Sequence, residues 1–181
     1  MKKVVKYIFR IYQHFLFKSI VEKSTKPLLL LDIDNTLAHT WPSLKRKWDS
    51  ESIRVLNLPP LQPVIDYINS IYPIAKYEWI FLTSRSYSLR KTTINWLLNQ
   101  KLPASNKNVI LVQSPNEKLV LIKKYVKKSS IYFDDLSYNH ENGEIKFYMD
   151  EINQYKNLDN IQYFGNNQII EIIKMYGQNN K

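Results

Sequence analysis

A run of four leucines at positions 28–31, which stops abruptly at two aspartates, is the feature that most constrains this chain. The uninterrupted apolar run after Pro27 predicts a strand buried on both faces, as in the centre of a parallel sheet. Asp32 and Asp34 are separated by one residue, so both side chains would point to the same side where the strand ends. Converging carboxylates need a counter-ion, usually a metal, whereas an ordinary Asp-Asn turn would need none.

Length and composition fit one domain with a sizeable core. The chain has 181 residues, of which 44% are hydrophobic and 13% aromatic. It contains no cysteine, so disulfides and thiolate metal sites are excluded and only oxygen and imidazole ligands remain. The absence of cysteine fits an oxidising or a reducing compartment equally well.

The formal net charge of +10 is concentrated at the N-terminus. Residues 1–27 contain seven lysines and arginines against Glu22, a net charge of +6, which leaves +4 for the other 154 residues. This excess indicates an anionic partner for the N-terminal segment, either lipid or nucleic acid.

Residues 3–22 lack proline and glycine and predict a basic amphipathic helix, which we separate as region 1–26 from a catalytic domain at 27–181. Its polar stripe consists of Lys3, Lys6, Arg10, Gln13, His14 and Lys18. Its wide apolar face consists of Val4, Val5, Ile8, Phe9, Ile11, Tyr12, Phe15, Leu16 and Ile20. The charges argue against a membrane span, and no small-residue cleavage site follows. The helix could pack on its own sheet, contact a second subunit or lie on a membrane surface.

Further strands and helices alternate along the rest of the chain. Strands are predicted at 77–82, 109–112, 131–133 and 161–164, and helices at 61–71, 88–99, 115–128 and 167–176. This order predicts an α/β fold with a doubly wound parallel sheet of about five strands and ligands at the carboxyl ends of the strands. Residues 38–63 predict a short flap with helical pieces, whose Trp41 and Trp48 could cover a substrate, stack on a base or pack the flap onto the domain.

Two further residues at predicted strand or helix ends, Thr83 and Lys118, are candidates for a functional role. Thr83 ends a strand, where its hydroxyl could donate to a phosphoryl oxygen. Ser114, Pro115 and Glu117 form a capping box, which puts Lys118 in the first turn of a helix. The helix dipole disfavours a lysine there, so Lys118 is either an anion-binding residue or a solvated side chain.

Adjacent acids also follow an apolar strand at Asp134 and Asp135, where they repel each other unless a cation is bound. Further on, His140 lies in a predicted loop near glycine 143, and could face a substrate or simply be solvated.

Taken in order, Asp32-Ile-Asp34-Asn35-Thr36, Thr83, Lys118 and the acidic pair at 134–135 resemble the four motifs of the haloacid dehalogenase (HAD) superfamily of phosphatases and phosphotransferases. The resemblance implies that Asp32 attacks phosphorus and that Asp34 is the general acid and base. It also implies that Thr83 and Lys118 hold phosphoryl oxygens. Magnesium would be held by Asp32, the backbone carbonyl of Asp34, Asp134 and Asp135. Asn35 replaces a glycine that is common in the family.

The resemblance implies a magnesium-dependent phosphomonoester hydrolase with a minimal cap, because no insertion has the size of a full cap domain. An open cleft would suit a phosphate on a bulky or macromolecular substrate. Residues 90–97 are similar to a helix of the polynucleotide 3′-phosphatases, although Leu136 stands where those usually have arginine. A membrane-tethered lipid or glycan phosphatase and a non-catalytic binding module are further alternatives. We expect a cytoplasmic protein, peripheral at a membrane if the N-terminal helix binds lipid.

Overall fold

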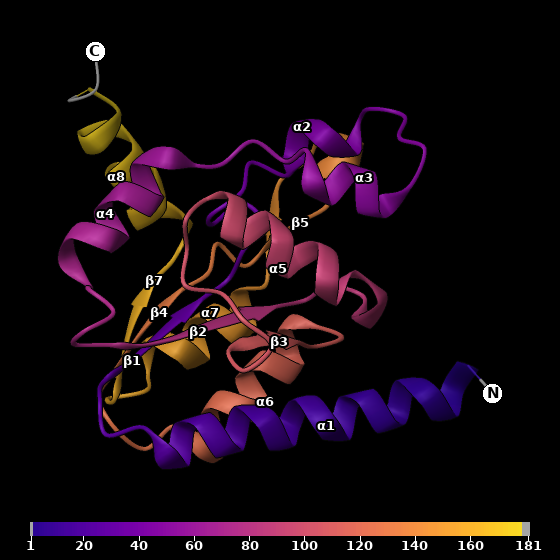
Figure 1. The fold of residues 1–181 in the computed structure, drawn as a ribbon. Helices are drawn as coiled ribbons and strands as arrows, with labels where there is room; N and C mark the ends of the chain where they lie inside the picture. Colours follow the sequence, from indigo (N-terminus) through magenta and orange to yellow (C-terminus); the bar gives the residue numbers. More distant parts are fainter. Residues whose placement is uncertain (1, 179–181) are drawn as a thin grey trace.

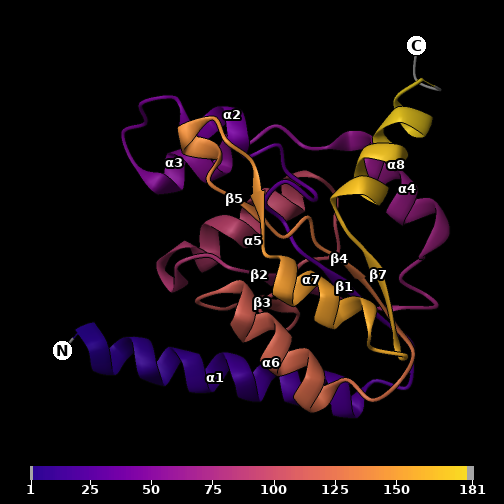
Figure 2. The same cartoon turned by 180° about the vertical axis from the view of Figure 1, so that it is seen from behind.

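The computed structural model describes residues 2–178 of the chain (Figures 1 and 2). Its elements are α1 (Lys2–Lys23), β1 (Leu28–Leu31), α2 (Trp41–Leu44), α3 (Glu51–Leu56), α4 (Gln62–Ile71), β2 (Glu78–Thr83), η1 (Tyr87–Leu89), α5 (Arg90–Asn99), β3 (Val109–Leu111), α6 (Pro115–Tyr125), β4 (Ser130–Phe133), β5 (Ser137–Tyr138), η2 (His140–Asn142), β6 (Lys146–Phe147), α7 (Met149–Lys156), β7 (Ile161–Phe164) and α8 (Asn166–Gln178).

Five parallel strands form the main sheet in the order β3-β2-β1-β4-β7, with β1 at the centre. All four leucines of β1 are completely buried, as the apolar run predicts. Leu31 is in register with Phe81 of β2 and with Phe133 of β4, so the carboxyl ends of these three strands lie side by side. The predicted α/β architecture with a five-stranded parallel sheet is therefore confirmed, and its topology is Rossmann-like.

The leucines of β1 alternate between two hydrophobic cores, one on each face of the sheet. Leu29 and Leu31 pack with α4, α5 and α8, whereas Leu28 and Leu30 pack with α1, α6 and α7. This alternation follows from the two-residue period of a strand. Figure 1 shows the two helical layers with the sheet between them, and α1 along the lower edge of the molecule.

The segment between β4 and β7 differs most from the prediction of a turn and loop. It contains the β5-β6 hairpin, η2 and the helix α7. Tyr155 is the single buried residue of α7, so the sequence carries no strong apolar period there. A smaller difference concerns helix α6, which ends at Tyr125 rather than near 128.

One of the two tryptophans of the flap, Trp41, packs the flap onto the domain, whereas Trp48 bonds within the flap. The ring of Trp41 stacks on that of His140, with centroids 3.7 Å apart, and the indole N–H of Trp48 donates to the backbone oxygen of Ser43 at 2.8 Å. His140 is 6% exposed, so its solvated alternative is wrong. Of the interpretations considered, the structure favours packing of the flap onto the domain for Trp41.

Helix α1 packs on α6 and β3, but most of the wide apolar face of its sequence is not part of that contact. Of that face, Leu16 and Ile20 pack against the core and Phe9 stacks on Tyr87. Gln13, from the polar stripe, is 1% exposed, whereas Phe15, from the apolar face, is 67% exposed. A helix that packs on its own domain ordinarily buries its apolar stripe, so this orientation is unexpected. Within residues 2–178, no helix has the length and hydrophobicity that crossing a membrane requires.

Candidate active site

The predicted site residues meet at the carboxyl edge of the sheet, because β1, β2 and β4 end there together. A cavity of about 300 Å³ opens at this edge. It is lined by Asp32, Asp34, Asn35, Ser84, Gln113, Pro115, Lys118, Asp134, Asp135, Leu136, Ser137 and Tyr148. The structure therefore brings together every predicted site residue except Thr83. Within the described chain no residue between 36 and 83 lines this cavity, so the flap does not wall it.

Three buried carboxylates form the centre of the site. One oxygen from each of Asp32, Asp134 and Asp135 can be chosen so that all three lie within 4.8 Å of one another. The ammonium of Lys118 donates to Asp32 Oδ1 at 2.6 Å and to Asp134 Oδ2 at 2.7 Å. Three carboxylates against one ammonium leave this acid cluster with two uncompensated negative charges when all the acids are ionised.

The pKa values of the cluster reflect that excess. Burial raises the pKa of Asp32 to about 7, against the opposing effect of the Lys118 ammonium and with a further contribution from Asp134. Burial, together with Asp134 and Asp32, holds the pKa of Asp135 well above its usual value. Burial alone would lower the pKa of Lys118, but its two carboxylate partners raise it instead. Lys118 therefore stays charged, but its single positive charge does not balance the three carboxylates.

The acid cluster has the chemistry of a site for a hard divalent cation. Carboxylate oxygens are the ligands that magnesium and calcium prefer, and a divalent cation would balance the two excess charges. The residues therefore fit the predicted metal, although the donor set does not distinguish between these ions. The carboxylate of Asp34 is not in the cluster, and the predicted role of its backbone carbonyl stays a prediction.

Asp34 is instead held by an arginine that the sequence interpretation overlooked. Arg85 donates to both carboxylate oxygens of Asp34, each at 2.7 Å, and the Thr40 hydroxyl donates to Oδ1 at 2.7 Å. Burial alone would raise the pKa of Asp34, but Arg85 and Thr40 outweigh it and lower the pKa to about 2. Arg85 lies two residues after Thr83, and an arginine so close to a strand end was the signal available in the sequence.

The loop after β1 takes its shape from Asn35. Its backbone has φ +57°, a left-handed conformation that asparagine tolerates and glycine adopts freely. The side-chain oxygen of Asn35 accepts from the backbone N–H groups of Thr40 and Trp41. Asn35 therefore adopts a left-handed backbone conformation and at the same time holds the start of α2 through its side chain.

Lys118 is positioned by the start of α6. The Ser114 hydroxyl accepts from the backbone N–H of Glu117 at 3.2 Å, as the capping box predicts, and the Glu117 carboxylate accepts from the backbone N–H of Gln113 at 2.7 Å. Lys118 is 2% exposed, so its solvated alternative is wrong. Glu117 also accepts from Arg10 and His14, so the helix turn that carries Lys118 is tied to α1.

Thr83 is placed differently from its prediction. It ends β2 and is completely buried, and its hydroxyl has no hydrogen-bond partner among the described residues. Ser84, the next residue, does line the cavity. The phosphoryl-binding role of Thr83 stays a prediction, and Ser84 is a second hydroxyl to be tested for it.

Two tyrosines that the sequence interpretation omitted hold Asp134. The hydroxyl of Tyr132 donates to Asp134 Oδ2, and that of Tyr163 donates to the Asp134 backbone oxygen at 2.7 Å. The backbone N–H of Leu136 donates to Asp134 Oδ1 at 3.0 Å. Tyr132 precedes Asp134 by two residues and so points to the same side of β4, which is a signal that the sequence did contain.

Comparison with protein-family models, with curated proteins and with solved structures found no match to this chain. A functional assignment therefore depends on the residues of the site and their geometry.

Proposed function

We propose that this protein is a magnesium-dependent phosphomonoester hydrolase of the HAD type. The observation that carries the proposal is the division of four acids at one strand edge into two environments. Asp32, Asp134 and Asp135 share the single ammonium of Lys118, which contacts Asp32 and Asp134, whereas Asp34 is paired separately with Arg85. A nucleophile beside a cation site and a separate acid and base are the two parts that this reaction needs.

In the proposed first step, an Asp32 oxygen attacks phosphorus in line and the bond from phosphorus to the leaving oxygen breaks. The leaving oxygen takes a proton from Asp34, and Asp32 becomes an aspartyl-phosphate. In the second step, water attacks that phosphorus and gives its proton to Asp34, which releases inorganic phosphate and restores Asp32. Magnesium bound by the acid cluster would supply the positive charge that lets an anionic nucleophile approach an anionic phosphate.

The proposed role of Asp34 as an acid requires Arg85 to change partner. With its pKa at about 2, Asp34 is charged and cannot donate a proton while Arg85 holds it. A phosphoryl group in the cavity would offer Arg85 a second anionic partner, because guanidinium binds phosphate oxygens as well as carboxylates. We therefore propose that substrate binding draws Arg85 away and raises the pKa of Asp34.

A phosphate on a bulky group suits the cavity, since the flap contributes no residue to its lining. The nucleic-acid alternative gains no support from the helix that suggested it. Arg90 donates to the backbone oxygens of Val109 at 2.6 Å and of Asn106 at 2.7 Å, so it is engaged inside the domain. Leu136, where the 3′-phosphatases usually carry arginine, is 2% exposed.

The test is release of phosphate from an aryl phosphate with magnesium and after chelation. We expect Asp32→Asn to lose at least about a thousandfold in kcat, because the nucleophile is removed. Asp159→Asn is the matched control, since Asp159 is exposed and lies outside the site. Wild-type protein that binds magnesium but hydrolyses no phosphomonoester in a panel of aryl, sugar, lipid and 3′-phosphorylated DNA substrates would contradict the proposal and favour the binding module.

A further inference from the structure

Helix α1 is attached to the domain by one stripe of residues. The polar residues of this stripe make hydrogen bonds and ion pairs with the domain. The side-chain oxygen of Gln13 accepts from the backbone N–H of Leu111 at 3.0 Å and from Arg90 at 3.0 Å. Arg10 and His14 bind the Glu117 carboxylate at 2.6 and 2.5 Å. These contacts fix which side of α1 faces the domain.

Two apolar residues complete the same stripe. Phe17 is completely buried and Val21 is 6% exposed, and both belong to the core under α6. Positions 10, 13, 14, 17 and 21 recur at steps of three and four residues, so they lie on one side of the helix. The rotation of α1 about its axis is therefore fixed by polar contacts at positions 10–14 and by core packing at 17 and 21.

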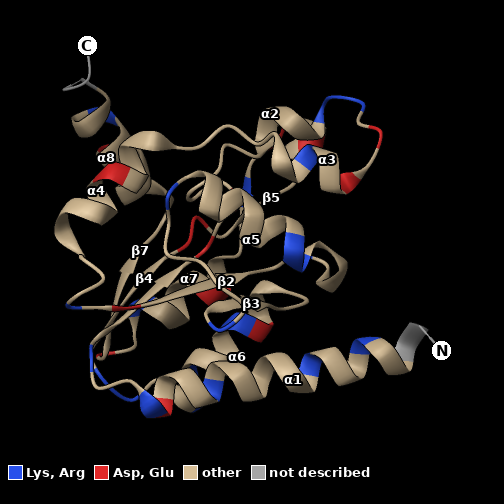
Figure 3. Ribbon diagram, viewed as in Figure 1, with Lys and Arg blue, Asp and Glu red and all other residues tan. Residues whose placement is uncertain are grey.

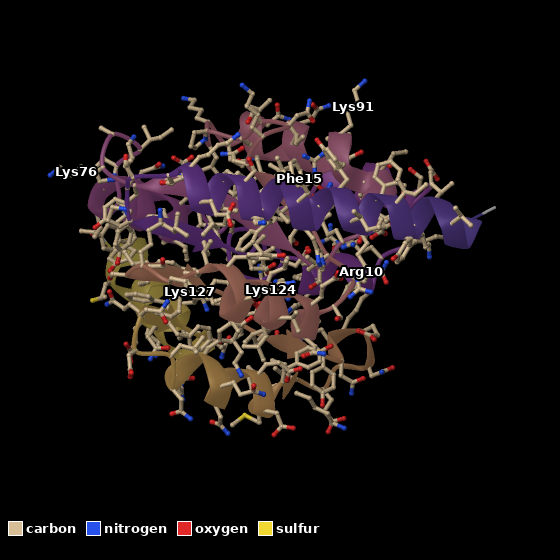
Figure 4. All side chains as sticks on the ribbon, turned by 90° about the horizontal axis from the view of Figure 1, so that it is seen from below. Arg10, Phe15, Lys76, Lys91, Lys124 and Lys127 are labelled. Carbon is tan, nitrogen blue, oxygen red and sulfur yellow. The ribbon has the colours of Figure 1, made fainter. Side chains whose placement is uncertain are left out.

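The opposite side of α1 is an apolar surface in solvent. Its centre is Val4, Ile8, Ile11 and Phe15, which again recur at steps of three and four residues and are 52–67% exposed. Val5, Tyr7, Phe9 and Tyr12 widen it on both sides and are 42–63% exposed. Figure 4 shows α1 across this face of the molecule, with Phe15 on the helix side that is turned away from the domain. A contiguous apolar surface of this kind marks an interaction site.

Basic side chains surround the apolar surface. Lys91 of α5 lies on one side of α1 in Figure 4, and Lys124 and Lys127 lie on the other, at and just beyond the end of α6. All three are exposed, as is Lys18 of α1 itself. Glu22 is the single acid in α1, and Figure 3 shows that the charges along the helix are otherwise basic. The face is thus an apolar stripe with a basic rim.

Charge decides between the candidate partners. A second copy of the chain would bring two basic rims together, which is unfavourable. Nucleic acid would meet the basic rim but would leave the central aliphatic and aromatic side chains against phosphates. An anionic lipid surface satisfies both parts, because apolar side chains enter the acyl boundary while lysines and arginines contact the headgroups.

We propose that α1 is a membrane-surface helix that lies flat on anionic lipid through Val4, Ile8, Ile11 and Phe15. The helix stays attached to the domain by the stripe that contains Gln13 and Phe17, so the whole protein docks as one body. The proposal is independent of the proposed enzymatic function, since it uses no residue of the acid cluster.

The test uses the full-length protein and flotation with phosphatidylcholine vesicles, with and without phosphatidylserine. We expect binding to the anionic vesicles alone, and weaker binding as salt is added. The double variant Ile8→Gln/Phe15→Gln keeps the charge and should bind at least about tenfold more weakly, because both apolar side chains are lost from the interface. The matched control is Ile170→Gln/Met175→Gln on α8, where both residues are also exposed.

Several results would overturn the proposal: no binding to anionic vesicles, equal binding to neutral ones, or unchanged binding of the Ile8/Phe15 variant. If sedimentation shows that the wild type is a dimer and the Ile8/Phe15 variant is a monomer, the face would be assigned to a second copy of the chain instead. If the double variant proves unfolded by circular dichroism, Lys124→Gln/Lys127→Gln tests the basic rim without touching α1. If that rim variant then binds anionic vesicles as tightly as the wild type does, the proposal is contradicted.

Discussion

Replacing Lys118 by methionine tests the electrostatics of the acid cluster directly. Methionine keeps most of the apolar stem but removes the ammonium that lies 2.6 Å from Asp32 Oδ1 and 2.7 Å from Asp134 Oδ2. Lys118, Asp32 and Asp134 are all nearly completely buried, so solvent screens little of the change. Three acids whose oxygens lie within 4.8 Å of one another would then share the site without a basic partner.

Loss of one partner from a buried ion pair costs about 3–5 kcal/mol of unfolding free energy. For a chain of this size, each kcal/mol corresponds to about 2–4 °C in Tm, so Lys118→Met should lower Tm by about 6–20 °C in a chelator. Magnesium should restore a larger part of Tm in the variant than it adds to the wild type, because a bound cation replaces the missing positive charge.

Thermal unfolding followed by circular dichroism measures both effects, with chelator and with magnesium. Lys124→Met is the matched control, since Lys124 is exposed on the same helix and should change stability by less than about 0.5 kcal/mol. A Lys118→Met variant as stable as wild type in chelator would refute the reasoning. So would a magnesium effect on Tm that is no larger in the variant than in the wild type.

Two further predictions concern the contacts around this cluster. Arg85→Ala should raise the pKa of Asp34 from about 2 toward its usual 3.8, because burial then acts against the Thr40 hydrogen bond and the charge of Arg54 without the Arg85 guanidinium. NMR titration of the carboxyl carbon measures this pKa, and an unchanged value would contradict the assigned cause. Glu117 has its pKa lowered below its usual 4.5, against burial, by Gln113 N–H, His14 and Arg10. Its contribution to the attachment of α1 is therefore present above pH 4.5 and lost as pH falls through the lowered pKa. The protection factors of α1 amides, which correct for the intrinsic pH dependence of exchange, should fall over that range in wild type. Glu117→Gln should show low protection at all pH values, and α1 protection that is equal in both would contradict the attachment.

The sheet and the acid cluster could be predicted because both depend on local sequence. The four leucines between Pro27 and Asp32 favour a short, fully buried strand, and residues that follow parallel strands lie at the same edge of a sheet. Asp32 and Asp134 therefore meet through topology alone. The capping box likewise placed Lys118 from three neighbouring residues.

Other features could not be predicted because they depend on contacts between distant segments. The pairing of Arg85 with Asp34 spans 51 positions and is set by two loops. The amphipathic pattern of α1 predicted two faces but not their partners, because a buried glutamine and a buried glutamate can reverse which side meets the domain. The β5-β6 hairpin and α7 bury few apolar residues, so their sequence had little periodicity.

The most direct test of the proposed function is capture of phosphate on Asp32 during turnover. The protein is mixed with a radiolabelled aryl phosphate and magnesium, quenched in acid and digested, and the labelled peptide is identified by mass spectrometry. We expect label on the peptide that contains Asp32, released by hydroxylamine as an acyl phosphate is, and absent from Asp32→Asn. Phosphate release with no label on the wild-type protein, or label that persists in Asp32→Asn, would contradict Asp32 as the nucleophile.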